Sequence, residues 1–178
     1  TASWFTAPML VAFVIFGTMP MWIEPIGLYS YLGVEVLIWV IFALGFNLLL
    51  GYTGLPSFGH GAFFGIGGYA FGWFQFNMIS NLWLSLIFAV VMTAAIGGVV
   101  ALSLSHRRGI YFALLTIAVG QIFFFIASKW TTLTGGEDGM LGIKRLPVEL
   151  GVTTISLKEN TSLYYFSFVI FVVLVIFL

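Results

Sequence analysis

The first hundred residues of this chain contain almost no charge. Between Thr1 and Ser105 there is no Lys, Arg or Asp, and the only formal charges are Glu24 and Glu35. The whole chain of 178 residues is 61% hydrophobic and only 7% charged, whereas the surface of a water-soluble domain needs far more charge than that. Most outward side chains must therefore meet hydrocarbon, and the sequence indicates an integral membrane protein.

Other absences narrow the function. The chain has no Cys, which excludes disulfides and thiolate metal sites within it, and its two His residues are too far apart in sequence to form a metal pattern. The net charge is zero, so no polybasic tail points to nucleic acid or anionic lipid as a partner. There is no phosphate loop, no nucleophile beside a base and no pair of catalytic carboxylates. We therefore expect no enzyme, no nucleic-acid partner, no metal site and no cofactor bound by this chain.

Long apolar runs dominate what is present. A helix needs about 20 apolar residues to cross a hydrocarbon core of roughly 30 Å, and these runs lack the alternation of the roughly 10-residue strands of a membrane barrel. We predict an all-α, polytopic transmembrane helical bundle that forms a single domain over residues 1–178. Its five to six membrane segments include one that is broken by glycine and proline. The expected segments are Trp4–Trp22, Tyr31–Leu50, the shorter Ala62–Phe76, Leu82–Leu104, Ile110–Trp130 and the beginning of another at Leu163–Leu178.

The orientation in the membrane depends on one short loop. Arg107 and Arg108 lie in the link between two long apolar runs, and short loops rich in Lys or Arg stay cytoplasmic. The polar stretch Thr131–Ser162 is then an external loop. If the segment Gly51–Phe76 completes a crossing, the N-terminus is cytoplasmic; if the segment dips in and returns, the N-terminus is external.

The stretch Gly51–Gly61 is the strongest chemical feature. It holds Pro56 and four glycines, which would break a helix, and broken backbone at membrane depth is tolerated only where it is buried in protein or lines an aqueous cavity. We expect Ser57 and His60 to lie beside a translocation pathway. The alternative is a simple loop at the membrane surface, because hydropathy does not fix the depth of a loop.

The last residue of this stretch begins a series of four glycines at spacings of four, three and four residues. Gly61, Gly65, Gly68 and Gly72 therefore fall on one face of a helix, and small residues on one face let another helix approach closely. We expect this face to be a helix-packing face.

Four further polar residues in or beside the apolar runs are pathway candidates. Glu35 is the one ionisable residue inside a predicted span, and such a carboxylate should face protein, water or a partner chain unless it reaches the outer interface. Asn47, Thr116 and Gln121 are candidates too, although residues of this kind also form hydrogen bonds between helices.

The external loop opens with turn-forming residues. Lys129–Gly139 includes three glycines and the adjacent carboxylates of Glu137 and Asp138. Calcium binding is conceivable, but the ligand spacing of an EF-hand is absent. A rigid turn is the better interpretation.

Two stretches together resemble one family. The first runs from Leu44 to Gly54 and from Ser57 to Tyr69, and the second from Arg108 to Thr116 and from Lys129 to Gly142. They are similar to the LivM-type permeases of branched-chain amino-acid ABC importers. Pro56 departs from the family pattern, and this departure would move the helix break by a turn.

The resemblance implies a multi-pass subunit of the bacterial inner (plasma) membrane that is surrounded by lipid and forms half of a translocation pathway. Its implied partners are a second, LivH-like permease, two cytoplasmic ATP-binding subunits that hold ATP and magnesium, and a periplasmic substrate-binding protein. Members of the family continue beyond Leu178, so we expect a fragment whose ATPase-docking loop lies further on. Related permeases carry urea or short amides. A self-contained channel or secondary carrier, or a membrane anchor without a transport role, are alternatives from other classes.

Overall fold

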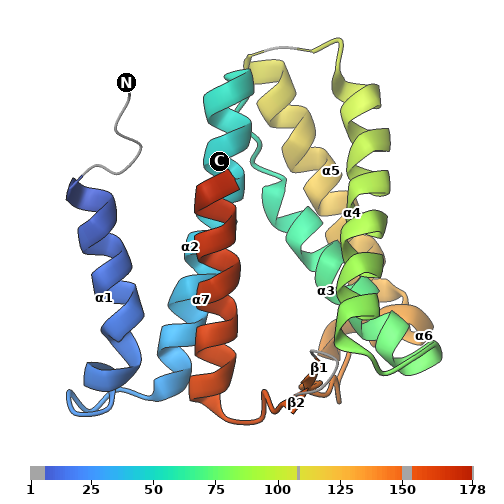
Figure 1. The fold of residues 1–178 in the computed structure, drawn as a ribbon. Helices are drawn as coiled ribbons and strands as arrows, with labels where there is room; N and C mark the ends of the chain where they lie inside the picture. Colours follow the sequence, from blue (N-terminus) through green and yellow to red (C-terminus); the bar gives the residue numbers. More distant parts are fainter. Residues whose placement is uncertain (1–6, 108, 150–153, 178) are drawn as a thin grey trace. The chain divides into compact units, whose positions relative to one another are not determined.

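The computed structural model describes residues 7–107, 109–149 and 154–177, and these confirm the predicted bundle of transmembrane helices (Figure 1). Four helices of this part are long and apolar enough to cross a membrane, and a shorter apolar helix precedes them. Two short strands pair in a two-stranded sheet. The elements are α1 (Ala7–Ile23), α2 (Ser30–Thr53), α3 (His60–Asn77), α4 (Leu82–Leu104), α5 (Ile110–Lys129), α6 (Thr131–Thr134), the 3-10 turn η1 (Gly136–Asp138), β1 (Val148–Glu149), β2 (Thr154–Ile155) and α7 (Asn160–Phe177).

The helix bounds follow the hydropathy of the sequence closely, with two differences. The last helix begins at Asn160, so the end of the predicted loop Thr131–Ser162 is already helical. The break between α2 and α3 is shorter than Gly51–Gly61, because α2 continues to Thr53. Trp4, Arg108 and Leu178, which figured in the predictions, lie outside the described residues.

The end of α2 explains why the break starts late. A glycine inside a helix costs only about 1 kcal/mol, so Gly51 can remain part of α2. Gly54 has a φ of +67°, the left-handed conformation that ends many helices. Its N–H donates to the carbonyl of Leu50 at 2.9 Å. The break therefore comprises residues 54–59.

The chain divides into two compact units, residues 1–44 with 155–178 and residues 45–154. In the first unit, α1, the first part of α2 and α7 share a small apolar core. The ring of Tyr164 lies 3.0 Å from the position of a Cβ at Gly33, and the Tyr164 hydroxyl donates to the carbonyl of Phe16. The buried members of this core are Met19, Ile23, Val34, Leu37, Tyr164 and Phe171.

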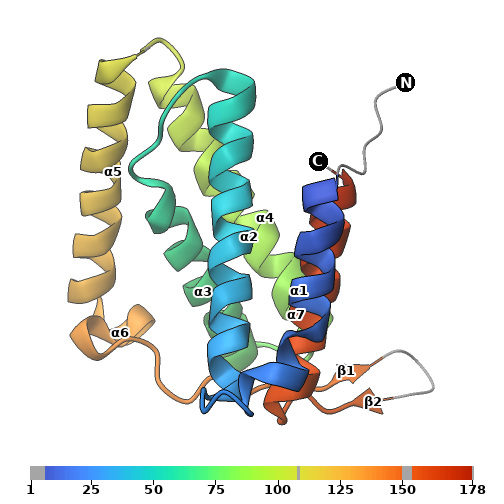
Figure 2. The same ribbon diagram turned by 90° about the vertical axis from the view of Figure 1, so that its left-hand side faces the viewer.

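The second unit contains the end of α2, the break, and helices α3, α4 and α5. The side chain of Asn81 caps α4 by accepting from the N–H groups of Trp83 and Leu84 at 3.0 and 3.2 Å. The ring of Phe88 packs against Phe74 of α3, with ring centroids 5.0 Å apart. Helices α3 and α4 therefore form a tightly packed hairpin, beside which α5 lies (Figures 1 and 2).

The broken segment crosses the second unit. It starts at the end of α2, at the same end of this unit as the α4–α5 link, and α3 finishes at the opposite end beside α6 and β1 (Figures 1 and 2). Helix α3 has 18 residues and extends about 27 Å at 1.5 Å per residue. Residues 54–59 supply the rest of the path across this unit, so the segment does not return to the end from which it starts.

Candidate functional site

The break is fastened to the second turn of α5. The backbone N–H of Phe58 donates to the hydroxyl oxygen of Thr116 at 3.1 Å, and the Thr116 hydroxyl donates in turn to the carbonyl of Ala113 at 2.7 Å. Thr116 is only 5% exposed. This hydrogen bond holds the non-helical backbone of the break against α5 and gives the Phe58 amide a partner that hydrocarbon could not supply.

Glycine permits this close approach. A Cβ at Gly59 would lie 2.1 Å from the carbonyl oxygen of Thr116, and a Cβ at Gly120 would lie 3.3 Å from the Cα of Gly59. Two backbones therefore touch without intervening side chains. We call Phe58, Gly59, Thr116 and Gly120 the break clamp.

The remaining candidates near the break are Ser57 and His60. Ser57 is 3% exposed, so it is enclosed by protein. The His60 ring contacts the ring of Phe46 edge-on, with centroids 6.0 Å apart, and its Nε2 lies 3.4 Å from the position of a Cβ at Gly45. The structure thus gathers Ser57, His60 and Thr116 around the break.

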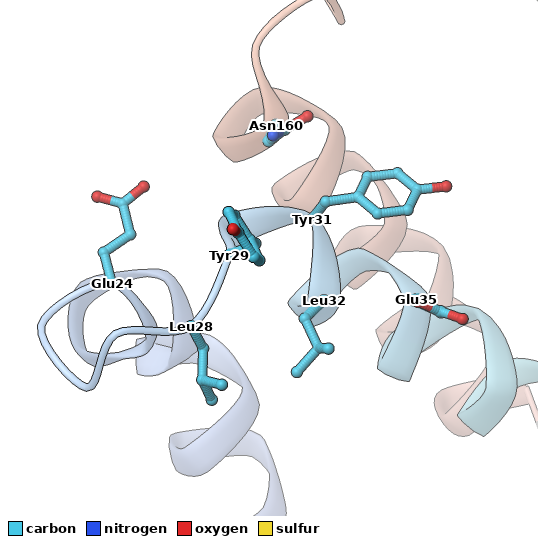
Figure 3. A pocket seen from close by; sticks show the side chains of 7 residues that line it. All are labelled: Glu24, Leu28, Tyr29, Tyr31, Leu32, Glu35 and Asn160. Carbon is cyan, nitrogen blue, oxygen red and sulfur yellow. The ribbon is translucent and has the colours of Figure 1, made fainter.

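The other pathway candidates lie elsewhere. Asn47 and Gln121 are exposed on α2 and α5, and Glu35 is exposed in the second turn of α2, in the first unit. Glu35 lines a hollow of about 550 Å³ at the α1–α2 connection. Figure 3 shows that the carboxylates of Glu24 and Glu35 lie on opposite sides of this hollow and do not point toward each other. The seven lining residues are Glu24, Leu28, Tyr29, Tyr31, Leu32, Glu35 and Asn160.

The predicted glycine face of α3 is only partly occupied. A Cβ at Gly72 would lie 2.5 Å from Met140 Sδ and 2.8 Å from Ile143 Cδ1, whereas no atom lies within 4 Å of a Cβ at Gly61, Gly65 or Gly68. Packing of α3 on α4 instead uses Gly67, whose Cβ position is 3.3 Å from Thr93 Oγ1. Within the described part of this chain, Gly72 alone among the four predicted glycines has a close neighbour.

The open glycines help to form a groove that the sequence analysis missed. The groove has a volume of about 710 Å³ and runs between α3, α4 and α5 as far as η1. Its walls are mostly apolar, and Glu137 lies at the η1 end. The lining residues are Gly61, Ala62, Gly65, Ile66, Tyr69, Ala70, Trp73, Phe88, Met92, Ile96, Gly120, Phe123, Phe124, Ile126, Ala127, Ser128, Leu133, Thr134, Gly136 and Glu137. The signal in the sequence is the absence of side chains at Gly61, Gly65 and Gly120.

The turn that closes one end of the groove is rigid. The Thr134 hydroxyl donates to the carbonyls of Ala127 and Trp130 at 2.5 and 2.7 Å. Gly135 has a φ of +84°, and a Cβ there would lie 2.0 Å from the carbonyl oxygen of Gly139. On the surface of this turn, Lys129 Nζ and Glu137 Oε1 form an ion pair at 3.0 Å.

The loop beyond this turn is tied to α3. The Gln75 side chain donates to the carbonyl of Lys144 at 2.9 Å and accepts from its N–H at 2.7 Å. Gln75 is buried. This pair of hydrogen bonds fixes the loop to the last part of α3, at the same end of the unit as α6.

Comparison with known proteins agrees with the architecture and with the resemblance of the two motifs. The family described as "Branched-chain amino acid transport system / permease component" matches residues 28–178. The high-affinity branched-chain amino acid transport system permease protein LivM of Escherichia coli (strain K12) is 32% identical over 109 residues, or 61% of this chain. The protein of the same description from Salmonella typhimurium (strain LT2) is 31% identical over 109 residues. The match spans 26% of the length of each relative, and no solved structure matches the chain. With a family match over residues 28–178, the chain belongs to the permease components of branched-chain amino acid transport systems.

Proposed function

We propose that this chain is the transmembrane permease part of an ABC importer for branched-chain or related hydrophobic amino acids. In this proposal it lies in the bacterial inner membrane and forms half of the translocation pathway. The observation that carries the proposal is the break clamp, in which the break between α2 and α3 is held against α5.

A helix break within a membrane has a chemical consequence. Hydrocarbon cannot satisfy free backbone amides and carbonyls, so such breaks occur where a substrate, water or protein supplies partners. No side chain caps the start of α3, and the start of a helix carries a partial positive charge. The broken crossing therefore supports a pathway for a small polar or zwitterionic solute.

Transport needs partners that supply the energy. The sequence contains no phosphate-binding loop, so in this proposal ATP and magnesium are held by two cytoplasmic subunits. A LivH-like permease supplies the other half of the pathway, and a periplasmic binding protein delivers the substrate. The names of the LivM relatives favour amino acids over urea or short amides as the substrate.

The test is uptake by the full-length transporter in proteoliposomes. Radiolabelled L-leucine should accumulate only when the partner subunits, the binding protein and ATP are all present, and excess L-isoleucine should compete. A matched assembly with an ATPase subunit inactivated by mutation should take up none. Leucine flux without ATP would indicate a channel or secondary carrier, and uptake of urea in place of leucine would favour the amide branch of the family.

A further inference from the structure

We propose that the groove between α3, α4 and α5 is an external access site for a zwitterion with an apolar side chain, whose charged end is held by Lys129 and Glu137. The inference rests on the proposed function, because it names where a hydrophobic amino acid first meets this chain. It concerns residues of the second unit only.

The walls of the groove suit an apolar side chain. Its volume of about 710 Å³ falls within the range of roughly 300–1,000 Å³ that is usual for small-molecule sites. Such sites are mostly apolar, with a few polar groups at one end. Here Tyr69, Trp73 and Phe123 contribute aromatic wall, and Ser128, Thr134 and Glu137 lie toward the η1 end.

The ion pair at that end offers one positive and one negative group, as the binding of a zwitterion requires. The Lys129 and Glu137 side chains are 60% and 77% exposed, and an exposed pair of this kind contributes only about 0–1 kcal/mol. Breaking this ion pair so that each side chain can bind a new partner therefore costs little free energy. An α-carboxylate replaces Glu137 as the partner of Lys129, and an α-ammonium replaces Lys129 as the partner of Glu137.

The backbone beneath the two charges does not need to move. Thr134 and Gly136 are buried, and the hydrogen bonds of the Thr134 hydroxyl fix the turn to the end of α5. A preorganised backbone with mobile charged side chains can accept a ligand without paying for the ordering of a loop.

The other end of the groove reaches the break clamp. Gly120 lines the groove and also contacts Gly59, and Gly61 lies in the first turn of α3. The groove thus runs from the surface ion pair to the broken backbone. Weak binding along such a route is expected, because a translocated solute must leave as readily as it enters.

The absence of Cys in this sequence permits a direct test in the full-length transporter, prepared without reactive cysteines elsewhere and without the binding protein. The Leu133→Cys variant places a thiol on the groove wall, and the Leu141→Cys variant places one in the same loop outside it. Millimolar L-leucine should slow labelling of the first variant by a small maleimide severalfold and leave the second unchanged. The carboxylate-free analogue 3-methylbutylamine should protect neither.

Substitutions then test whether Lys129 and Glu137 bind the charged groups of leucine and whether the groove wall binds its side chain. In the Leu133→Cys background, Lys129→Gln and Glu137→Gln should each raise the half-protecting leucine concentration about fivefold, which is the upper range for an exposed ion pair. Gly65→Leu should abolish protection because Gly65 lines the groove. Gly68→Leu is the matched control, since its Cβ position is equally open but lies outside the groove lining.

The outcomes separate the two proposals. If ATP-driven leucine uptake is intact but leucine does not protect the Leu133→Cys variant, the groove site is overturned and the proposed function stands. If the unmodified transporter takes up no leucine, the proposed function itself fails. Protection by added phosphatidylethanolamine and not by leucine would make the groove a lipid site and overturn the inference.

Discussion

At the scale of single residues, Gly59 leaves almost no room for a side chain. A Cβ at this position would lie 2.1 Å from the carbonyl oxygen of Thr116, and this oxygen belongs to the backbone of α5, which cannot rotate away. We expect Gly59→Ala to lower the melting temperature of the purified full-length transporter by several degrees and to reduce its yield, as overpacking costs roughly 1–3 kcal/mol. Gly61→Ala is the control, because no atom lies within 4 Å of its Cβ position. Equal melting temperatures for the two variants would contradict the close approach.

The hydroxyl of Thr116 is the second test at this scale. Thr116→Val keeps the shape of the side chain but leaves the Phe58 N–H without its acceptor, and an unsatisfied buried donor costs about 1–3 kcal/mol. Thr116→Ser retains the oxygen. Thermal unfolding should show a loss of stability for the valine variant and near-normal behaviour for the serine variant. A valine variant as stable as the serine variant would mean that water or another group satisfies the amide.

The sequence indicates a helix break near Pro56 but does not reveal which residue the backbone of the break contacts. Glycine and proline act locally, so their effect on a helix is visible in a short window. The residue that accepts from Phe58 lies 58 positions away, and no local pattern connects the two. Thr116 and Gly120 are four residues apart, a spacing that on its own favours contact with another helix, but in the structure they contact the turn at Phe58 and Gly59 before α3.

At the scale of helices, hydropathy predicts α4 to the residue and α5 to within one residue. Polar residues bound both runs sharply, which is why their ends can be read from the sequence. The end of α2 cannot be predicted this way, because it is set by the left-handed conformation of Gly54. The groove cannot be predicted from the sequence either, because its volume depends on the distance between α5 and the glycines of α3 that have no close neighbour.

Gly72 tests the packing of α3 against the loop that follows η1. Its Cβ position is 2.5 Å from Met140 Sδ and 2.8 Å from Ile143 Cδ1, so Gly72→Leu should displace the loop from the helix. Limited proteolysis of the full-length transporter should then cleave the loop around residues 140–145 faster than in the unsubstituted protein. Gly68→Leu, on the same helix with open space around it, should leave the cleavage rate unchanged. Equal rates for both variants would show that the loop is held by the Gln75 hydrogen bonds alone.

At the scale of the whole molecule, orientation follows from the short link after α4. Because the broken segment crosses the second unit, a cytoplasmic link at Arg107 places the start of α1 on the cytoplasmic side and the turn at Glu137 outside. A His106→Cys variant should react with a membrane-impermeant thiol reagent only from the cytoplasmic face, and a Glu137→Cys variant only from the external face. Labelling from the opposite faces would reverse the topology and remove the external access assigned to the groove.

Alternating access by the assembled transporter should be visible at the break. Ser57 is 3% exposed in this structure, so a Ser57→Cys variant should label slowly in the state represented here. If the break lines the pathway of the importer proposed above, ATP binding and hydrolysis on its partner subunits should change the access of water to the break, because the pathway of such an importer opens to opposite sides in turn. The labelling rate with a small polar thiol reagent should therefore differ between the nucleotide-free and ATP-bound complexes. A rate that is high and identical in every nucleotide state would identify residues 54–59 as an ordinary interfacial turn and would shift the pathway toward Glu35 and Gln121.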